Sequence, residues 1–250
     1  MIKFFRNIRK KLAAENKVAS YLRYAIGEVV LVVVGILIAL QINTWNEQRK
    51  TNELETKILK ELQSNLTLDL REIQNDLGSM DDINKACKDI KYYVEGHDNP
   101  SDSLFKTFGI LRVTPHFDPN KSGYGLLQSK GVEVISNDSL RNAISLLYER
   151  YYPYYKRYEE ERLRFHALHS EPILLKYFSM HFDLNAFYNA NFEISYEDFQ
   201  KLKSDNTFLK LLSAIAFENS AVQNRGKRIK QRIISLLNAL EKELLSKGNE

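Results

Sequence analysis

The chain has 250 residues, 44% apolar and 27% charged, which is enough for one globular domain of ordinary size plus an additional segment. Its 10 glycines and 5 prolines are few for a sandwich or barrel rich in turns, so a helical class is favoured. The formal net charge of +4 arises in residues 1–23; the rest of the chain keeps 29 of the 36 basic and 31 of the 32 acidic residues, which argues against a nucleic-acid-binding domain.

Residues 1–23 combine basic side chains with a narrow apolar face. Phe4, Phe5, Ile8 and Leu12 recur at helical spacing, with lysines and arginines between them. This pattern is typical of a short helix that lies on an anionic membrane surface. We therefore predict a basic amphipathic arm on the cytoplasmic side of a membrane; binding of a partner protein is the alternative.

The apolar segment 24–45 is long enough to cross a bilayer. Its sequence is YAIGEVVLVVVGILIALQINTW, and a helix of this length spans about 33 Å. It is apolar on every face from Val29 to Leu40, and Tyr24 and Trp45 stand where interfacial aromatic residues are expected. A buried core helix and a cleaved signal peptide are the alternatives. Because no small-x-small cleavage site follows Leu40, an uncleaved transmembrane signal anchor is favoured.

The distribution of basic residues predicts the orientation of this anchor. The basic arm precedes it and the residues that follow are nearly balanced in charge, which places the amino terminus in the cytoplasm and residues 46–250 outside. Glu28 is an ionisable group at a depth where it is costly, and Gly35 with Ala39 forms a small-xxx-small pair. We expect Glu28, Gly35 and Ala39 to form an interface with a second copy or another membrane protein. Snorkelling of Glu28 toward the arm is the alternative.

The exterior region 46–250 is predicted to be mainly helical. Apolar residues spaced by three or four predict long helices over 52–93, from 137 or 138 to beyond 158, and over 207–246, with a weaker helix over 195–204. Asn137 or Asp138 is the predicted N-cap of the second helix, and Ser195 with Asp198 suits a capping arrangement in the weaker one. Pro153 is expected to bend the middle helix. We therefore predict a mostly α chain: one N-terminal transmembrane helix followed by an antiparallel helical bundle.

Two stretches of the exterior region lack a helical pattern. Residues 95–103 are predicted to be a loop, because Gly, Asp, Asn, Pro and Ser dominate them. Residues 105–136 have poor periodicity, and within them 110–113 and 132–135 are read as short strands or as extended connections. Cys87, the single cysteine of the chain, excludes an intramolecular disulfide and is expected to be a buried, idle thiol.

The first 47 residues, MIKFFRNIRKKLAAENKVASYLRYAIGEVVLVVVGILIALQINTWNE, resemble the opening of DUF6090, an uncharacterised family of Bacteroidota membrane proteins. The family's central pattern is similar to Leu127, Ser129, Gly131, Ile135, Asn137 and Leu140, followed by Tyr151 and Tyr152. The resemblance implies a bacterial inner-membrane location with a periplasmic domain, and it carries no activity or catalytic residue.

Tyrosines and basic residues form two clusters in the exterior region. Six tyrosines surround Pro153, and packing between helices is favoured over an aromatic-lined ligand pocket, for which Tyr148, Tyr151 and Tyr155 are the candidates. Five basic residues lie within 225–232. A solvated face is favoured for them, with the acidic run 159–161 and lipid headgroups as alternatives.

His166 and His169 are the remaining candidates for chemistry. Their spacing places two imidazoles on one helical face, as in zinc sites, but a third ligand would have to come from another helix. We expect no cofactor. The leading functional hypothesis is a non-enzymatic envelope protein, which acts as a scaffold, an accessory subunit or a sensing ectodomain. An envelope enzyme or metal-binding protein that uses these histidines is the alternative.

Overall fold

The computed structural model describes residues 7, 10, 18–182 and 190–248. The chain divides into two compact units, Met1–Leu54 and Glu55–Glu250. The predicted boundaries at residues 23 and 45 stay predictions, and most of the predicted arm lies outside the described residues.

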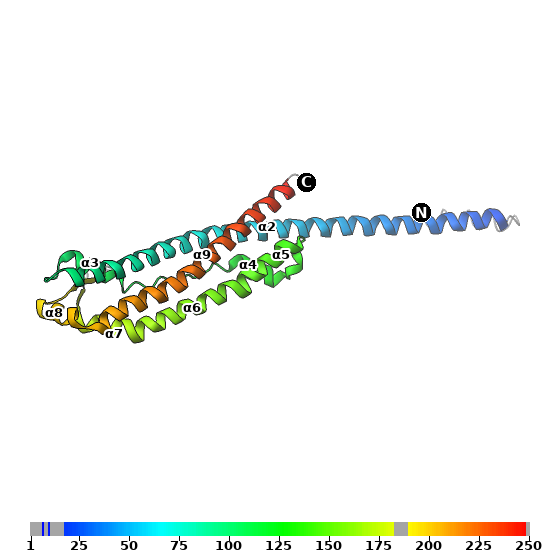
Figure 1. Cartoon of the computed structure of the whole chain (residues 1–250). Helices are drawn as coiled ribbons and strands as arrows, with labels where there is room; N and C mark the ends of the chain where they lie inside the picture. Colours follow the sequence, from blue (N-terminus) through cyan, green and yellow to red (C-terminus); the bar gives the residue numbers. More distant parts are fainter. Residues whose placement is uncertain (1–6, 8–9, 11–17, 183–189, 249–250) are drawn as a thin grey trace. The chain divides into compact units, whose positions relative to one another are not determined.

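Helix α2 (Val18–Gly96) supplies the described part of the first unit from residue 18 onward (Figure 1). Every side chain from Val29 to Leu40 is exposed, with Val29 at 62% and Leu40 at 58% of full exposure. The segment is therefore not a core helix of this chain. By length and composition, α2 is a helix that can cross a membrane.

The second unit is built from three long helical stretches. The first is α2 from Glu55 to Gly96, and the last is α9 (Asn206–Gly248). Between them runs a nearly continuous helix made of α5 (Asp138–Leu146), the π turn η2 (Leu147–Tyr151), α6 (Tyr152–Phe165), the π turn η3 (His166–Ser170) and α7 (Glu171–Tyr177). Shorter elements connect them: α3 (Asp102–Ile110), α4 (Ser122–Lys130), the 3₁₀ turn η1 (Val132–Val134) and α8 (Tyr196–Ser204). The prediction of a mostly helical chain with a helical bundle is confirmed.

Side-chain contacts give the directions of the three stretches within this unit. Along α2, Glu55, Leu77 and Met80 contact Lys247, Gln223 and Asn219, so α9 runs antiparallel to α2. Glu55 also contacts Ser136, and Asp69 contacts Tyr152, so α5–α7 runs parallel to α2. A parallel pair requires a return connection, and residues 111–137 provide it, with α4 near its end (Figure 1).

Helix starts follow the predicted capping residues. The side chain of Asn137 accepts a hydrogen bond from the N–H of Leu140 at 3.2 Å, and that of Ser195 accepts one from the N–H of Asp198 at 3.0 Å. Each satisfies one of the N–H groups that a helix leaves unpaired in its first turn. The predicted starts of α5 and α8 are confirmed.

Strands occur where none was predicted. β1 (Ser179–Phe182) and β2 (Ala190–Glu193) pair antiparallel, with Ser179 opposite Glu193 and Met180 opposite Phe192. The strand reading of 110–113 and 132–135 is wrong, because Ile110 ends α3 and Val132–Val134 is a 3₁₀ turn. Each of these short apolar runs contains a buried residue at or next to the end of a helix. Periodicity alone does not distinguish a run of this length from a strand.

Two prolines explain the two π turns of the middle helix. Pro153 and Pro172 each stand two residues after a π turn, which ends with Tyr151 in the first case and Ser170 in the second. A proline inside a helix lacks an N–H and its ring clashes with the carbonyl four residues earlier. The wider π turn accommodates this by inserting one residue into the helix. The predicted disturbance at Pro153 is thus a π turn just before it.

The core runs along the contacts among α2, the middle helix and α9. Gly226 allows α9 to approach closely, because a Cβ atom there would lie 2.9 Å from the hydroxyl of Tyr155 and 3.1 Å from Leu77. Cys87 is buried in the apolar cluster near α3, and burial raises the pKa of its thiol to about 12. The expectation of a buried thiol is confirmed, and a thiol with this pKa is a poor nucleophile at neutral pH.

Candidate functional site: a buried polar layer and its cavity

Polar side chains are buried where the three long stretches meet. Charged and amide residues are uncommon in a core unless they have partners, so their contacts indicate what the layer does. The buried polar residues of α2, α6 and α9 in this layer are Asn65, Asp69, Glu159, Arg162, Asn219 and Gln223.

Two amides of α9 attach this helix to α2. The Nδ2 atom of Asn219 donates to the carbonyl of Met80 at 2.7 Å and to Oδ1 of Asn84 at 3.0 Å. One turn further along, Nε2 of Gln223 donates to Oδ1 of Asp81 at 2.6 Å. These bonds fix the register between the antiparallel helices, since a shift of either helix would leave buried amides without partners.

Carboxylates and an amide hold the return segment, residues 111–137. Its backbone N–H groups at Phe117, Asp118, Asn120 and Gly123 donate to Glu159, Glu72, Asp69 and Asn65 over 2.8–3.1 Å. Phe117, Asp118 and Asn120 precede α4 without regular structure, and Gly123 lies in the first turn of α4, where N–H groups have no partner within the helix. The side chains therefore supply the acceptors that these backbone donors need. Asp69 also accepts from the hydroxyl of Tyr152 at 2.9 Å. Burial raises the pKa of Asp69, and its hydrogen bonds to Asn120 and Tyr152 oppose that shift.

Arg162 is the charged centre of the layer. Its Nη1 donates to Oδ1 of Asn219 at 3.3 Å and its Nη2 donates to the carbonyl of Pro115. Over residues 18–182 and 190–248, no carboxylate oxygen lies within 4.0 Å of its guanidinium nitrogens. Burial lowers the pKa of Arg162, and the nearby Glu159 opposes this shift most.

Two carboxylates near Arg162 have perturbed pKa values. Burial raises the pKa of Glu159 to about 8, although the N–H of Phe117 and the charge of Arg162 favour its ionised form. Burial and the neighbouring Glu72 raise the pKa of Asp76 to about 6. Perturbed carboxyl groups around one buried cation are a recurrent feature of functional sites.

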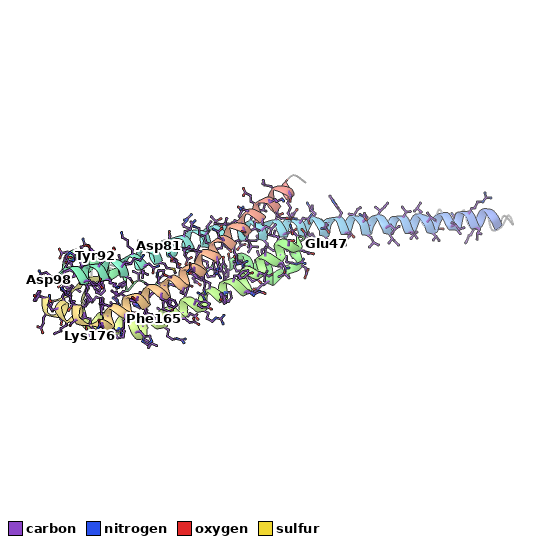
Figure 2. All side chains as sticks on the ribbon, viewed as in Figure 1. Glu47, Asp81, Tyr92, Asp98, Phe165 and Lys176 are labelled. Carbon is purple, nitrogen blue, oxygen red and sulfur yellow. The ribbon has the colours of Figure 1, made fainter. Side chains whose placement is uncertain are left out.

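A small cavity adjoins this layer and is called here the α6–α9 cavity. It is lined by Ile83, Leu111, Val113, Thr114, Arg162, Phe165, His166, Ser170, Ile215, Glu218 and Asn219. About 20 Å³ is open to the centre of a water-sized sphere, which is space for one or two small molecules of water size. Phe165, labelled in Figure 2, lies at the end of α6 on this cavity.

Among the residues that the structure describes, four buried polar atoms of the layer and the adjacent turn have no hydrogen-bond partner. They are Oδ2 of Asp76, the hydroxyl of Tyr155, Nε of Arg162 and Oγ of Ser170. Arg162 and Ser170 both line the cavity. Buried polar atoms normally have partners, so these four are hydrogen-bonding groups that the described residues leave unused.

The predicted tyrosine pocket is divided between the core and the surface. Tyr148 is buried, stacks on Tyr124 with ring centroids 4.5 Å apart, and donates to the carbonyl of Asn120 at 3.2 Å. Tyr155 is buried beside Gly226. Tyr151 is half-buried, and the guanidinium of Arg232 in α9 lies 3.5 Å from its ring centroid. The structure therefore does not bring the three candidates together.

The two predicted histidines have different surroundings. His166 is half-buried on the α6–α9 cavity and burial lowers its pKa, whereas His169 is exposed. Both belong to the π turn η3, where a spacing of three residues covers less than a full turn. In the part of the chain that the structure describes, no group of three or more His, Cys, Asp or Glu side chains is arranged to hold a metal. The histidine metal site stays a prediction.

The predicted membrane-helix interface lies in the first unit. A Cβ atom at Gly35 would meet nothing within 4 Å, and Ala39 is exposed. Glu28 is half-exposed in the same helix. Both small residues leave the surface of α2 open to the approach of another helix, and the interface stays a prediction.

Two of the five basic residues within 225–232 meet tyrosines of the middle helix, one in α6 and one in η2. The guanidinium of Arg225 lies 3.6 Å from the ring centroid of Tyr158, and that of Arg232 lies over Tyr151. Glu159 points instead toward the core, where it accepts from Phe117. Two of these basic residues therefore stabilise the contact between α6 and α9 through cation–π interactions.

Sequence reasoning missed Arg162, Glu159 and Ser170 as parts of a site. A signal was present, because Glu159, Arg162, His166 and Ser170 continue the spacing of three or four that Tyr148, Tyr152 and Tyr155 begin. Charged residues at the positions expected on the buried face of a helix indicate a polar core.

Comparison with known proteins gives a family but no characterised relative. The model of a family of unknown function, DUF6090, matches residues 28–168. Comparisons with curated proteins and with solved structures found no match. The matched range contains residues 28–45 of the apolar segment, the return segment and the middle helix as far as Leu168, and it ends before α9 begins.

Proposed function

We propose, from the premise that this chain belongs to the DUF6090 family of unknown function, that it is a non-enzymatic protein of the bacterial envelope. In this proposal residues 24–45 cross the inner membrane once, the basic arm 1–23 lies in the cytoplasm and the domain from residue 46 is periplasmic. The domain acts through binding, as a scaffold, an accessory subunit or a sensing ectodomain. The lipid bilayer and a second copy or another membrane protein are its proposed partners.

The observation that carries this proposal is the exposed apolar surface of α2 between Val29 and Leu40. Burying one large aliphatic side chain is favourable by about 1.5–3 kcal/mol. A run of this length therefore favours transfer from water into a bilayer by more than ~10 kcal/mol. The excess of basic residues before the run supports a cytoplasmic amino terminus.

The contacts of the second unit support a binding role. Its buried carboxylates and amides hold backbone segments in place, as Asp69 and Asn65 do for the return segment. A domain with groups arranged this way offers a fixed surface and a small cavity lined by both polar and apolar side chains. These features suit recognition of a partner or ligand better than chemical catalysis.

Accessibility of introduced cysteines tests the topology. In a Cys87→Ala background, the exposed Ser64 of α2 and the exposed Asn7 would each be replaced by cysteine in separate proteins. A membrane-impermeant maleimide added to intact spheroplasts should label the cysteine at position 64 and spare that at position 7 until lysis. The reverse pattern would overturn the orientation. Recovery of the protein in the soluble fraction after lysis would refute the membrane anchor itself.

A further inference from the structure

Tyrosines of the middle helix and arginines of α9 form a row along the contact between these two helices. The guanidinium of Arg232 lies 3.5 Å from the ring centroid of Tyr151, and that of Arg225 lies 3.6 Å from the ring centroid of Tyr158. The two pairs are seven residues apart in both helices, which is about 10.5 Å along a helix axis. The row is called here the Arg–Tyr strip, and it consists of Tyr151, Tyr154, Tyr158, Arg225, Arg228 and Arg232.

The arginines of the strip are accessible and have no ionised partner among the described residues. Arg228 and Arg232 are exposed, Arg225 is half-buried, and Tyr154 keeps 44% of its full exposure. Over residues 18–182 and 190–248, no carboxylate oxygen lies within 4.0 Å of the side-chain nitrogens of these arginines. Residues 219–240 contain five basic residues and no Asp or Glu. This part of α9 therefore lacks the opposite charges, three or four residues away, that stabilise an ordinary solvated helix face.

The tyrosine rings hold two of the arginines without using most of their hydrogen-bond donors. At 3.5–3.6 Å from a ring centroid a guanidinium lies face-on against the ring, and its N–H groups point outward in the guanidinium plane. Nη1 of Arg225 donates to the carbonyl of Ala221 at 2.7 Å, and Arg232 has no hydrogen bond to a described residue. The hydroxyls of Tyr154 and Tyr158 lie 3.2 Å apart in the same strip. The strip thus offers positioned donors and aromatic surface, which suit a partner that carries carboxylates.

We propose that the Arg–Tyr strip is a docking surface for an acidic helical segment of another protein. Aspartates or glutamates spaced by three or four on that segment would face Arg225, Arg228 and Arg232 along two turns of α9. Tyr and Arg are enriched at the energetic centres of protein interfaces, whereas anionic lipid headgroups need only a diffuse group of lysines and arginines. The pairing of tyrosines with arginines therefore favours a protein over a lipid surface. The inference rests on the proposed binding function and deepens it, because it names the chemistry of the partner.

Site-specific photocrosslinking of the full chain in native membranes tests this surface. The exposed Tyr154 would be replaced by the photoreactive p-benzoylphenylalanine, and the crosslinked peptide would be identified by mass spectrometry. We expect a crosslink to a segment of another protein in which acidic residues outnumber basic ones and recur at spacings of three or four. A crosslink only to lipid, to a second copy of this chain or to a segment without that pattern, or no crosslink at all, would overturn the proposal.

Charge reversal then tests whether the arginines hold this partner. Arg228 is exposed and contacts no ring, so Arg228→Glu should retain the fold and lower the crosslinking yield about fivefold. Lys210→Glu makes the same charge change at an exposed position of α9 outside the strip and should leave the yield unchanged. Replacing the facing acidic residue of the partner by arginine should restore the yield with Arg228→Glu. Equal yields in the two variants, or no restoration, would overturn the proposal.

Cysteine labelling in the same membranes keeps this test separate from that of the proposed function. Labelling at positions 64 and 7 as expected, without an acidic crosslink, would overturn the docking surface alone. Reversed labelling together with an acidic crosslink that depends on Arg228 would overturn the proposed topology and support the docking surface.

Discussion

The ion pair between Glu55 and Lys247 joins the two ends of the second unit and allows a quantitative test. The Nζ of Lys247 lies 2.8 Å from Oε2 of Glu55, and the two side chains are 16% and 1% exposed. Oε1 of Glu55 accepts from the N–H and hydroxyl of Ser136 at 2.8 and 2.9 Å. One carboxylate therefore joins the start of this part of α2, the return segment and the end of α9.

Replacing Lys247 by methionine removes the cation and keeps the aliphatic part of the side chain. Leaving a fully buried carboxylate unpaired costs about 3–5 kcal/mol. Ser136 continues to donate two hydrogen bonds to Glu55, and Lys247 is partly solvated, so we expect a loss of about 2–3 kcal/mol. For a domain of this size that loss lowers Tm by roughly 4–12 °C.

Differential scanning calorimetry of the full chain in detergent would measure this change. Lys242→Met, at an exposed position of the same helix, is the matched control and should shift Tm by less than about 2 °C. In a double-mutant cycle with Glu55→Gln, the coupling free energy should be about 1–2 kcal/mol. A Lys247→Met protein that melts with the Lys242→Met control, or a coupling of zero, would refute the reasoning.

Three further predictions concern other parts of the chain. Because the pKa of Glu159 is raised to about 8 in the folded state, stability should be greatest below about pH 4.5 as far as this group is concerned and fall by up to about 1.4 kcal/mol per pH unit as pH rises toward 8. Glu159→Gln should flatten that dependence in urea titrations, and an unchanged slope would contradict the assignment. Gly226→Ala should destabilise by about 1–3 kcal/mol because its Cβ meets Tyr155, whereas Gly78→Ala, with nothing within 4 Å, should stabilise by up to about 1 kcal/mol; equal effects on Tm would count against the close approach. Gly35→Leu and Glu28→Leu should each reduce crosslinked species in native membranes, and an unchanged crosslinking pattern would remove the predicted interface.

Local sequence signals were sufficient for the helices and insufficient for their arrangement. Asn137 and Ser195 cap helices as predicted because a cap depends on residues three positions apart. The return segment gave no such signal, since its backbone donors meet Asp69, Asn65 and Glu159 from distant parts of the chain. Contacts of this kind depend on how helices pack, and periodicity within one helix does not contain that information.

The tyrosines around Pro153 also show that the sequence of one helix does not determine how it packs. Composition marks Tyr148, Tyr151 and Tyr155 as one aromatic group, whereas the bundle turns Tyr148 and Tyr155 into the core and Tyr151 toward Arg232. A helix that packs between two others has two buried faces and a narrow exposed one. Which tyrosines face inward is therefore decided by α2 and α9 rather than by the middle helix itself.

The buried face of the middle helix is aromatic in its first part and polar in its second part, and the polar part belongs to the candidate site. Tyr148, Tyr152 and Tyr155 fill the first part, and Glu159, Arg162 and Ser170 occupy equivalent positions further along. Apolar residues at Glu159 and Arg162 would leave the N–H of Phe117 and the carbonyl of Pro115 without these partners, so the polar side chains hold the return segment against the middle helix. The π turn at His166–Ser170, which precedes Pro172, adds one residue to the helix and so changes which side chains after Arg162 lie on its buried face; Ser170 is the buried residue of this turn.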